Sequence, residues 1–393
     1  MRVCLINHSY KPFIGSGTEN VVETIADSFF RNGDEVFIIA ARPRFWQEPI
    51  PSLPYRVIYF KSSFYSLSRM PYIVRIFWHI FNLFDIFTAL KVKSVLKREK
   101  PDLVITNNLA GLSHLVPNVI SELKIKHFHI LHDIQLLHPS GLLIWGQEKK
   151  IDNLPAKIYQ FFLRRAFAKV DVIISPSQWL LDIHLRKGFF VESRKKVMVN
   201  PIVVEKMLDN RRDGNIFRIL YATQIEEHKG IFFLIEAFNK FLEAGIHSQV
   251  KLIIVGGGAG QDQLCDSIRD NQNIEYLGRV DRARVFKEMG ESNLLIVPSL
   301  CYENSPTVMF EGIGTGLPVL AADIGGVGEI VNKYGGILFD PGDIDDLNKK
   351  LNIVIKNPQQ LEEIKNNYLR CHEELSDSAD NYLRNLNSLF KNV

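Results

Sequence analysis

The chain has 393 residues, of which 46% are hydrophobic and 23% are charged, and its formal net charge is +3. This composition is that of an ordinary globular protein and excludes an intrinsically disordered chain. One hydrophobic core rarely serves so many residues, so we expect two domains of roughly 150 to 200 residues.

The charge is divided unevenly along the chain. Residues 1–200 contain 27 Lys and Arg against 16 Asp and Glu, whereas residues 201–393 contain 20 against 28. A basic first half is typical of proteins that meet nucleic acid, an anionic membrane or a phosphorylated acceptor. No zinc-finger or RRM motif occurs in the sequence, so we expect no nucleic-acid partner.

The N-terminal residues Met1–Asn7 are typical of a buried strand and lack the apolar core and cleavage site of a secretory signal. We therefore expect a cytoplasmic protein, with possible peripheral attachment at the inner face of the cytoplasmic membrane. The cysteines are scattered, without a C-x-x-C pair, which predicts buried thiols rather than disulfides or a zinc site. They are Cys4, Cys265, Cys301 and Cys371.

Short apolar runs alternate with helix-like segments, which predicts parallel sheets with helices on both faces. The first series predicts strands at Arg2–Asn7, Glu35–Ala40, Leu103–Thr106, His127–Leu131 and Val172–Ser175, and a helix from about Glu19 to Arg31. The pattern then restarts, with strands at Phe217–Tyr221, Lys251–Val255, Ile274–Tyr276, Leu294–Val297 and Pro318–Ala321, and a helix from about Gly230 to Phe241.

We place a hinge between the two series. Val197–Ile202 contains Pro201, which lacks an N–H and restrains its neighbour, and a polar stretch at 209–215 follows. The predicted domains are residues 1–200 and 201–375, and residues 376–393 should form a helix that packs back on the first domain. Open α/β sheets bind ligands beyond the carboxyl ends of their strands, so we expect an interdomain cleft.

Residues 71–90 contain six aromatic side chains and precede a cluster of lysines and an arginine between residues 91 and 100. Their length suits a transmembrane helix, but Arg75 and Asp85 lie within them, and each charge costs about 2.5 to 3.5 kcal/mol at the bilayer centre. Two interpretations stay open. The segment is either a helix or helix pair covering the first sheet, or an interfacial element that faces anionic lipid.

A candidate anion site follows the apolar run 293–298. Ser305 is a favoured N-cap residue and Pro306 suits the first helical position, so a helix should begin there. The amides of Thr307 and Val308 would then lie at the positive end of that helix, where anions bind.

Two glutamates flank the start of this helix. Glu303 precedes it and can accept hydrogen bonds from sugar hydroxyls, whereas Glu311, more than one turn in, can hold the vicinal hydroxyls of a ribose. The alternative is a capped, solvent-facing helix with two incidental acids.

The stretch Pro298-Ser-Leu-Cys-Tyr-Glu303, continued by Gly316-Leu-Pro-Val-Leu-Ala-Ala-Asp323-Ile-Gly-Gly-Val-Gly-Glu329, closely resembles the signature of retaining glycosyltransferases of family 4. The resemblance covers most of the second half and, more thinly, the first. It implies the GT-B architecture, two Rossmann-like domains that face a cleft, and metal-independent transfer from a UDP- or GDP-sugar without a cofactor. By resemblance, Glu303 contacts the donor sugar, Glu311 the ribose, and the segment Ser305-Pro306-Thr307-Val308 the diphosphate.

The family's Gly-Arg-Leu-x-x-x-Lys-Gly segment, which supplies an arginine and a lysine to the diphosphate, is similar to Thr223–Gly230. Lys229 matches, but Gln224 stands where the family has arginine. A charge-assisted hydrogen bond contributes about 1.5 to 3 kcal/mol, so either another cation compensates or donor binding is weaker. The alternative for Lys229 is a solvated lysine before a helix.

Other segments match the family at single positions. Gly15-Ser-Gly17 resembles its glycine-rich first loop, which approaches phosphate or acceptor, and is otherwise a plain turn. His132, followed by Asp133, matches a histidine beside the donor sugar, which we take as catalytic with Glu303 and Lys229; a structural histidine is the alternative. Gly278-Arg279-Val280 matches a loop that passes the nucleobase.

Two motifs are set aside. Gly256–Gln261 lacks the last glycine of a dinucleotide fingerprint, so we expect no NAD. Asp343-Ile-Asp-Asp346 resembles a metal-binding Asp-x-Asp, but it is more typical of an N-cap with acids in the first turn, and we expect no metal.

Taken together, the resemblance and the basic first half predict a hexosyltransferase whose acceptor is a saccharide, lipid-linked as in surface polysaccharide, O-antigen or lipopolysaccharide synthesis. A nucleotide-sugar epimerase or phosphorylase on the same scaffold, and a non-catalytic sugar-nucleotide-binding protein, remain as alternatives.

Overall fold

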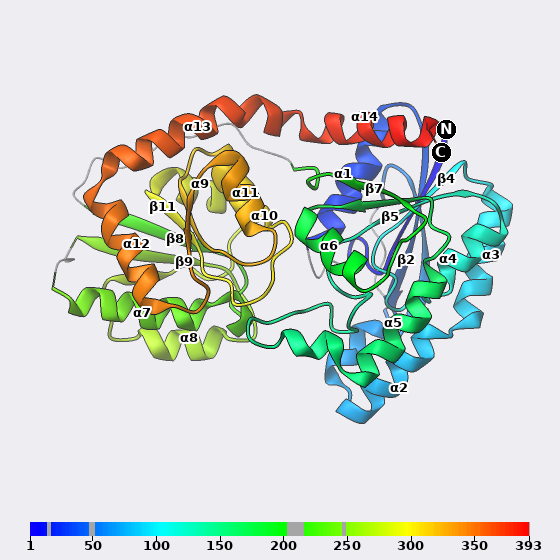
Figure 1. Ribbon diagram of the computed structural model, residues 1–393, viewed down its shortest axis with the longest axis horizontal. Coiled ribbons are helices and arrows are strands. Elements are labelled where there is room, and N and C mark those ends of the chain that lie inside the picture. The colour runs from blue at the N-terminus through cyan, green and yellow to red at the C-terminus, as the bar shows by residue number, and fades with distance from the viewer. Residues whose placement is uncertain (14–16, 47–51, 203–215, 246–248, 393) are drawn as a thin grey trace. The chain divides into compact units, whose positions relative to one another are not determined.

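The computed structural model describes residues 1–13, 17–46, 52–202, 216–245 and 249–392. Contacts divide the chain into two units (Figure 1). Unit 1 consists of Met1–Leu142, Glu148–Pro201 and Ala379–Val393, and unit 2 of Leu143–Gln147 and Ile202–Ser378. The sequence-based boundary after residue 200 lies one residue before this division, whereas the assignment of Leu143–Gln147 to unit 2 was not predicted.

The described part of unit 1 contains one parallel sheet. Its strands are β1 (Arg2–Asn7), β2 (Glu35–Pro43), β3 (Arg56–Ser62), β4 (Leu103–Thr106), β5 (Lys126–Ile130), β6 (Val172–Ser175) and β7 (Arg194–Val197). They are ordered β3-β2-β1-β4-β5-β6-β7, and Leu5 of β1 aligns with Ile38 of β2 and Ile105 of β4. The order runs outward in both directions from β1 and β4. Because parallel crossovers are right-handed, such an order puts helices on both faces.

The helices of unit 1 owe their positions to amphipathic sequence. In α1 (Thr18–Arg31), the buried residues Val21, Val22, Ile25 and Phe29 recur at helical spacing, and the helix packs on β1 and β2. The other helices and 3-10 turns are η1 (Phe64–Arg69), α2 (Tyr72–Leu83), α3 (Ile86–Glu99), α4 (Val116–Glu122), η2 (Glu148–Asp152), α5 (Leu154–Ala166), α6 (Gln178–Arg186) and α14 (Ser378–Lys391).

The described part of unit 2 repeats this plan. Its strands are β8 (Phe217–Ala222), β9 (Val250–Val255), β10 (Ile274–Tyr276), β11 (Leu294–Val297), β12 (Val319–Ala322) and β13 (Ile337–Phe339), ordered β10-β9-β8-β11-β12-β13 and all parallel. Its helices are η3 (Glu227–Lys229), α7 (Ile231–Glu243), α8 (Gln261–Ile268), α9 (Arg282–Glu291), α10 (Thr307–Gly314), α11 (Val327–Tyr334), α12 (Ile344–Lys356) and α13 (Pro358–Ser376). The prediction of two Rossmann-like units is confirmed.

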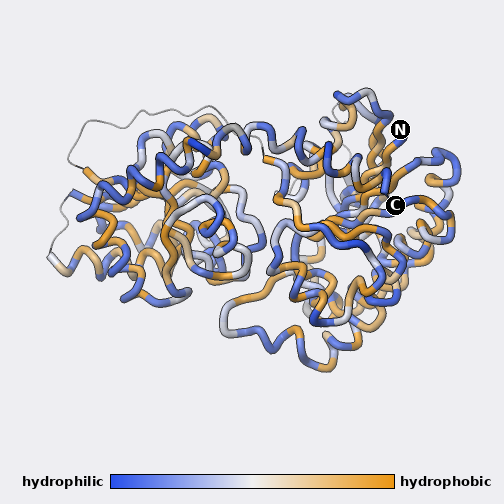
Figure 2. The backbone as a smooth tube through the Cα atoms, turned by 45° about the horizontal axis from the view of Figure 1, so that its top comes forward, coloured by the Kyte–Doolittle hydropathy of each residue, from blue (hydrophilic) through white to orange (hydrophobic). Residues whose placement is uncertain are grey.

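The central strands are almost entirely apolar because both faces of the sheets are covered. Every residue of β4, β6, β11 and β12 is buried, and in Figure 2 the hydrophobic strands run through the interior of each unit. Tyr382, Leu383, Leu386 and Leu389 of α14 join the core of unit 1 beside β1 and β4 residues. The C-terminal helix is therefore part of the fold of unit 1.

Of the strands that the structure describes, three were not predicted, and each of them lies at a sheet edge. β3 and β13 are only partly buried, and β7 has the sequence Arg194-Lys-Lys-Val197, largely exposed. An edge strand needs fewer apolar side chains and tolerates lysine, so it carries a weaker sequence signal.

The aromatic segment 71–90 forms a helix pair, α2 and α3, an arrangement that fits either of the two interpretations stated. The chain breaks between them because the Asp85 side chain accepts a hydrogen bond from the amide of Thr88, at 3.0 Å, and so caps α3. Within the described residues one stretch, Ile73–Glu99, is long and apolar enough to cross a membrane by length and composition alone.

Candidate active site

The candidate site of unit 2 lies where its strand order reverses. β8 and β11 are hydrogen-bonded neighbours, but the following strands lie on opposite sides of them, so the loops that leave their carboxyl ends diverge. Ligands of doubly wound sheets bind at this point. The two loops are residues 223–230 and 298–306, which contain the predicted residues Gln224, Lys229, Glu303, Ser305 and Pro306.

An ion pair joins these two loops. Lys229 Nζ lies 2.6 Å from Glu303 Oε1, and the side chains are only 18% and 15% exposed. Burial opposes the charge on Lys229, but the adjacent carboxylate outweighs it and raises the lysine pKa above its usual value. Lys229 is therefore a fixed cation at neutral pH, and not the solvated lysine of the alternative interpretation.

Glu303 is held through one of its oxygens. Ser299 Oγ donates to Oε1 at 2.9 Å, and the Cys301 thiol approaches the same atom at 3.8 Å. Burial and the Glu303 carboxylate raise the pKa of Cys301 to about 12, so the thiol stays protonated. In the described part of the chain no donor reaches Oε2, which leaves that oxygen able to accept a hydrogen bond from a ligand hydroxyl.

Backbone contacts fix the loop that carries Glu303. The Leu300 amide donates to His228 O at 3.0 Å, and the Tyr302 amide donates to Leu143 O at 2.9 Å. Leu143–Gln147 thus forms a short antiparallel bridge with the loop, through Ile144 and Cys301. This contact explains why that segment belongs to unit 2.

Two glycines allow the loop to be gripped closely. Gly230 has φ +76°, and a Cβ there would lie 1.8 Å from Pro298 O. Gly325 has φ +69°, a Cβ there would lie 2.2 Å from Glu303 O, and the next amide, of Gly326, donates to that same oxygen at 2.6 Å. Any side chain at either position would displace the glutamate loop.

Helix α10 begins one residue later than predicted. Pro306, not Ser305, is the N-cap, with ψ of 117°, and no side chain caps the helix. The Ser305 hydroxyl is buried without a hydrogen-bond partner. The prediction that Ser305 caps the helix is wrong because Pro306 is itself extended, which moves the N-cap one residue along the chain. Thr307 and Val308 therefore occupy the first two helical positions, with their amides uncapped by any side chain.

Glu311 lies one turn into α10, half-buried. Arg282 of α9 approaches it, with Nη2 3.5 Å from Oε1, and the same guanidinium lies over the Phe286 ring. The sequence analysis did not identify Arg282. The arginine lies in a helix without a recognisable motif, and only the tertiary fold brings it beside Glu311.

The remaining predicted donor residues surround the first loop. Gln224 is exposed, and its carbonyl accepts from the Tyr221 hydroxyl at 2.7 Å. Gly278 has φ +71°, and its carbonyl accepts from the Gly256 amide at 3.0 Å. Arg279 is exposed and Val280 half-buried.

The glycine run 256–260 supports the first loop. Ile225 donates to Gly257 O at 3.2 Å, and Gly260 donates to Ile225 O at 3.0 Å. These bonds give the run a structural role in place of the dinucleotide fingerprint. Asp343 accepts from the amides of Asp345 and Asp346, both at 2.9 Å, and so caps α12 as predicted. Among the residues that the structure describes, no group of three His, Cys, Asp or Glu side chains could hold a metal ion.

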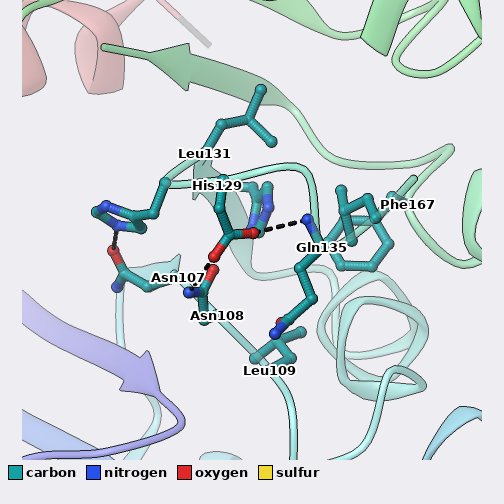
Figure 3. A pocket seen from close by; sticks show the side chains of 10 residues that line it. Asn107, Asn108, Leu109, His129, Leu131, Gln135 and Phe167 are labelled. Carbon is teal, nitrogen blue, oxygen red and sulfur yellow. Dashed lines mark hydrogen bonds between the residues drawn. The ribbon is translucent and has the colours of Figure 1, made fainter. Parts of the chain in front are cut away.

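His132 belongs to unit 1 and follows β5. Its Nε2 lies 2.8 Å from Oδ1 of Asn107, which follows β4 (Figure 3). An amide oxygen only accepts, so Nε2 carries the proton and Nδ1 is left as an acceptor. Burial, and the nearby His8, lower the pKa of His132 to about 3, so the ring is neutral at pH 7.

Asp133 anchors the next turn. It accepts from Asn108 Nδ2 at 2.9 Å and from the Gln135 amide at 2.6 Å, and burial raises its pKa to about 6. A cavity of about 10 Å³ among these side chains has room for about one water molecule (Figure 3). The Asn107 and Asn108 amides had no motif to reveal them, although their place directly after a buried strand was a usable signal.

The predicted first loop is described only in part. Gly15 lies outside the described residues. Gly17 precedes α1 as its N-cap, with φ of −74°. Because glycine lacks a side chain, no side-chain hydrogen bond caps the helix. Behind it, the buried Glu19 accepts a hydrogen bond from Ser9 at the carboxyl end of β1.

The sequence matches two families over nearly its whole length. Residues 15–206 match glycosyltransferase family 4, and residues 205–369 match glycosyl transferases group 1. Both matched families are glycosyltransferases and together they cover residues 15–369, so the chain belongs to the glycosyltransferases. An uncharacterized 42.6 kDa protein in the cps region of Klebsiella pneumoniae is 25% identical over 360 residues, 88% of this chain and 92% of that one.

Solved structures of glycosyltransferases show the same fold at low identity. Sucrose-phosphate synthase from Thermosynechococcus elongatus has a TM-score of 0.75 at 17% identity, with 100% of both chains covered. Anabaena HepE, solved in complex with UDP, has a TM-score of 0.72 at 18% identity, again with 100% of both chains covered. These similarities confirm the GT-B architecture predicted for this glycosyltransferase.

The contact between Gly325 and Glu303 generates a first prediction. Replacing Gly325 with alanine should displace the glutamate loop, lower transferase activity by at least about tenfold and destabilise the protein by roughly 1 to 3 kcal/mol. The matched control is Gly33→Ala, since Gly33 also has positive φ, +85°, but a Cβ there would meet nothing within 4 Å. Equal losses in activity for the two variants would show that the close contact is unimportant.

A second prediction concerns the proton on His132. Asn107→Asp places a carboxylate beside Nε2, which should raise the pKa of His132 toward neutrality, because the charged ring gains a partner. The imidazole would then be protonated at low pH and neutral only at high pH, and its NMR titration should move upward. Asn107→Ala removes the partner without adding charge, so an identical titration in both variants would contradict the assignment.

Proposed function

We propose that this glycosyltransferase moves a hexose, with retention of configuration and without a metal ion, from a nucleoside diphosphate sugar to a saccharide hydroxyl. The observation that carries the proposal is the Lys229–Glu303 pair at the strand-order reversal of unit 2, beside the uncapped start of α10. A cation, two backbone N–H groups and a carboxylate are the partners that a sugar diphosphate requires.

Each residue has a role that follows from its chemistry. Lys229 and the amides of Thr307 and Val308 stabilise the negative charge that develops on the departing diphosphate. Glu303 Oε2 accepts from a hydroxyl of the donor sugar, and Glu311 accepts from the ribose. We assign the neutral His132 ring to the sugar as well, where it orients the reacting centre without adding charge.

The ion pair between Lys229 and Glu303 prepares the lysine for the donor. The carboxylate keeps the ammonium in place before the donor arrives, and the diphosphate then shares it. Because the ammonium has three N–H donors, it can donate to the Glu303 carboxylate and to a diphosphate oxygen at the same time. Charge on the leaving group is therefore matched by a cation that needs little rearrangement, which is the condition for efficient electrostatic stabilisation.

The proposed donor and acceptor classes have separate support. Anabaena HepE was solved with UDP, which favours a UDP-sugar. The Klebsiella relative is encoded in a cps region, which favours an acceptor of surface polysaccharide synthesis, lipid-linked and met at the inner face of the membrane. Thermal-shift screening against UDP-, GDP- and ADP-sugars tests the donor, because a bound ligand raises apparent stability.

The reaction type is tested by product analysis. A transferase releases nucleoside diphosphate only when acceptor is present, whereas an epimerase releases none and interconverts the donor sugars. The anomeric coupling constant of the new linkage distinguishes retention from inversion, and activity that is abolished by EDTA and restored by a divalent metal would contradict metal independence. Tight donor binding without transfer across a broad acceptor panel would favour a non-catalytic binding protein.

Lys229→Ala should lower turnover by at least about tenfold, because a charge-assisted hydrogen bond to the leaving group is lost. Lys240→Ala is the matched control, since it removes an exposed lysine, paired with Asp345 at 2.9 Å, from the same unit. Circular dichroism verifies that both variants fold. Turnover in Lys229→Ala equal to that of the control would exclude the proposed role.

Gln224 and Arg279 form a second testable pair. Ile225, next to Gln224, is hydrogen-bonded to Gly257, and a Cβ on Gly257 would contact Arg279 Cβ at 3.4 Å. We propose that Arg279 supplies the cation that Gln224 lacks. Arg279→Gln should weaken UDP binding by about tenfold, and Gln224→Arg should restore it in the double variant. Unchanged binding in Arg279→Gln, measured by calorimetry, would contradict this compensation.

A further inference from the structure

A wide apolar surface covers one side of unit 1. On α2 and the first turn of α3, the large side chains of Ile73, Phe77, Ile80, Phe81, Ile86 and Phe87 are between 49% and 74% exposed. On α5, Leu154, Ile158, Phe161 and Phe162 are between 37% and 71% exposed. Soluble proteins rarely expose so many large apolar side chains together unless the surface binds something.

The two groups of side chains form one surface, although some 70 residues separate them in sequence. The Phe84 ring, at the end of α2, meets the Phe162 ring of α5 edge to face, with centroids 5.0 Å apart. In Figure 1, α2 and α5 lie at the same edge of unit 1. We call the exposed side chains of α2, the start of α3 and α5 the apolar face.

The helices cannot turn these side chains inward. The Asn82 side chain of α2 accepts from the Gly111 amide at 2.9 Å, and its carbonyl accepts from the His114 amide at 3.2 Å. On α5, Tyr159 and Leu163 are buried, and Tyr159 donates to Gln135 O at 3.0 Å. Exposure of the opposite faces is therefore a fixed property of the fold.

Basic residues outnumber acidic ones on the segments that carry the apolar face. Residues 71–100 contain six Lys and Arg against two Asp and Glu, and residues 148–169 likewise contain six against two. On α5, the Arg165 guanidinium lies over the Phe161 ring, 4.1 Å from its centroid, which places a cation at the apolar boundary. Apolar side chains carried on basic segments suit an anionic lipid surface, where the rings enter the acyl boundary and the cations meet headgroup phosphates.

We infer that the apolar face docks this glycosyltransferase on an anionic lipid bilayer, and that α5 contributes to the contact as much as α2 and α3. The helix pair lies on the membrane and does not cross it. The break at Phe84 and Asp85 and the Asn82 bonds hold the pair against unit 1, and a spanning segment would have to give up these contacts.

The contact also deepens the proposed function, on which this step rests, by giving a lipid-linked acceptor its place. The inner side of α2 connects to the carboxyl end of β1 through ring contacts: the Trp78 and Phe64 ring centroids lie 6.0 Å apart, and those of Phe64 and His8 meet edge to face at 5.1 Å. A saccharide on a lipid in the bilayer would thus be delivered beside the strand ends of unit 1.

The test compares single substitutions on each half of the face with one elsewhere. Phe77→Asp on α2 and Ile158→Asp on α5 should each weaken co-flotation of the full chain with phosphatidylcholine vesicles containing phosphatidylglycerol by about tenfold, because each replaces a lipid-inserted side chain by a charge. Ile353→Asp on α12, where the native side chain is 44% exposed, should float like the parent protein. High salt should weaken binding, and vesicles of phosphatidylcholine alone should bind less.

Each outcome decides the matter. Parent protein that fails to float, or Ile158→Asp that floats as well as the parent, would overturn the inference. A parent dimer in analytical ultracentrifugation that both substitutions convert to monomer, without vesicle binding, would assign the face to a second copy of the chain. UDP binding by thermal shift should be unchanged in all three variants, so failure of docking is distinguishable from failure of the proposed transfer.

Discussion

The candidate site of unit 2 depends on one largely buried ion pair, between Lys229 and Glu303. Taking two charges out of water costs several kcal/mol per ion, and their attraction offsets this only when the geometry is held. The two residues come from loops 74 residues apart in sequence. Their meeting therefore requires the parallel sheet, since only the neighbouring positions of β8 and β11 bring the two carboxyl ends together.

The glycines around the pair follow from that requirement. The Glu303 loop must be held in place to keep its carboxylate 2.6 Å from the Lys229 ammonium. Surrounding backbone holds it by direct contact: Gly230 lies against Pro298, and Gly325 lies against Glu303. Backbone contacts as close as these leave no room for a Cβ at the glycine positions. Positive φ, close approach and ion-pair geometry are thus three consequences of one constraint.

Sequence predicted what depends on local chemistry and missed what depends on tertiary position. Apolar runs predicted the buried strands, and residue spacing predicted the cap at Asp343. Family motifs pointed to the two loops that carry Lys229 and Glu303. The edge strands β3 and β7, Arg282 beside Glu311, and Asn107 beside His132 do not, because their neighbours come from distant parts of the chain. The start of α10 was misplaced by one residue because proline suits both the first helical position and the extended conformation, and Pro306 adopts the latter.

The two units handle charge in opposite ways at the carboxyl ends of their strands. In unit 1, burial holds the His132 ring uncharged at pH 7, and its partner, Asn107, is an amide. Unit 2 presents a fixed cation, Lys229, whose pKa the adjacent carboxylate raises. Neutral donors and acceptors match sugar hydroxyls, and a fixed cation matches a diphosphate. Six strands of the first sheet follow the same order as the six of the second, so this difference in charge lies in the loops that follow the strands and not in the sheet topology.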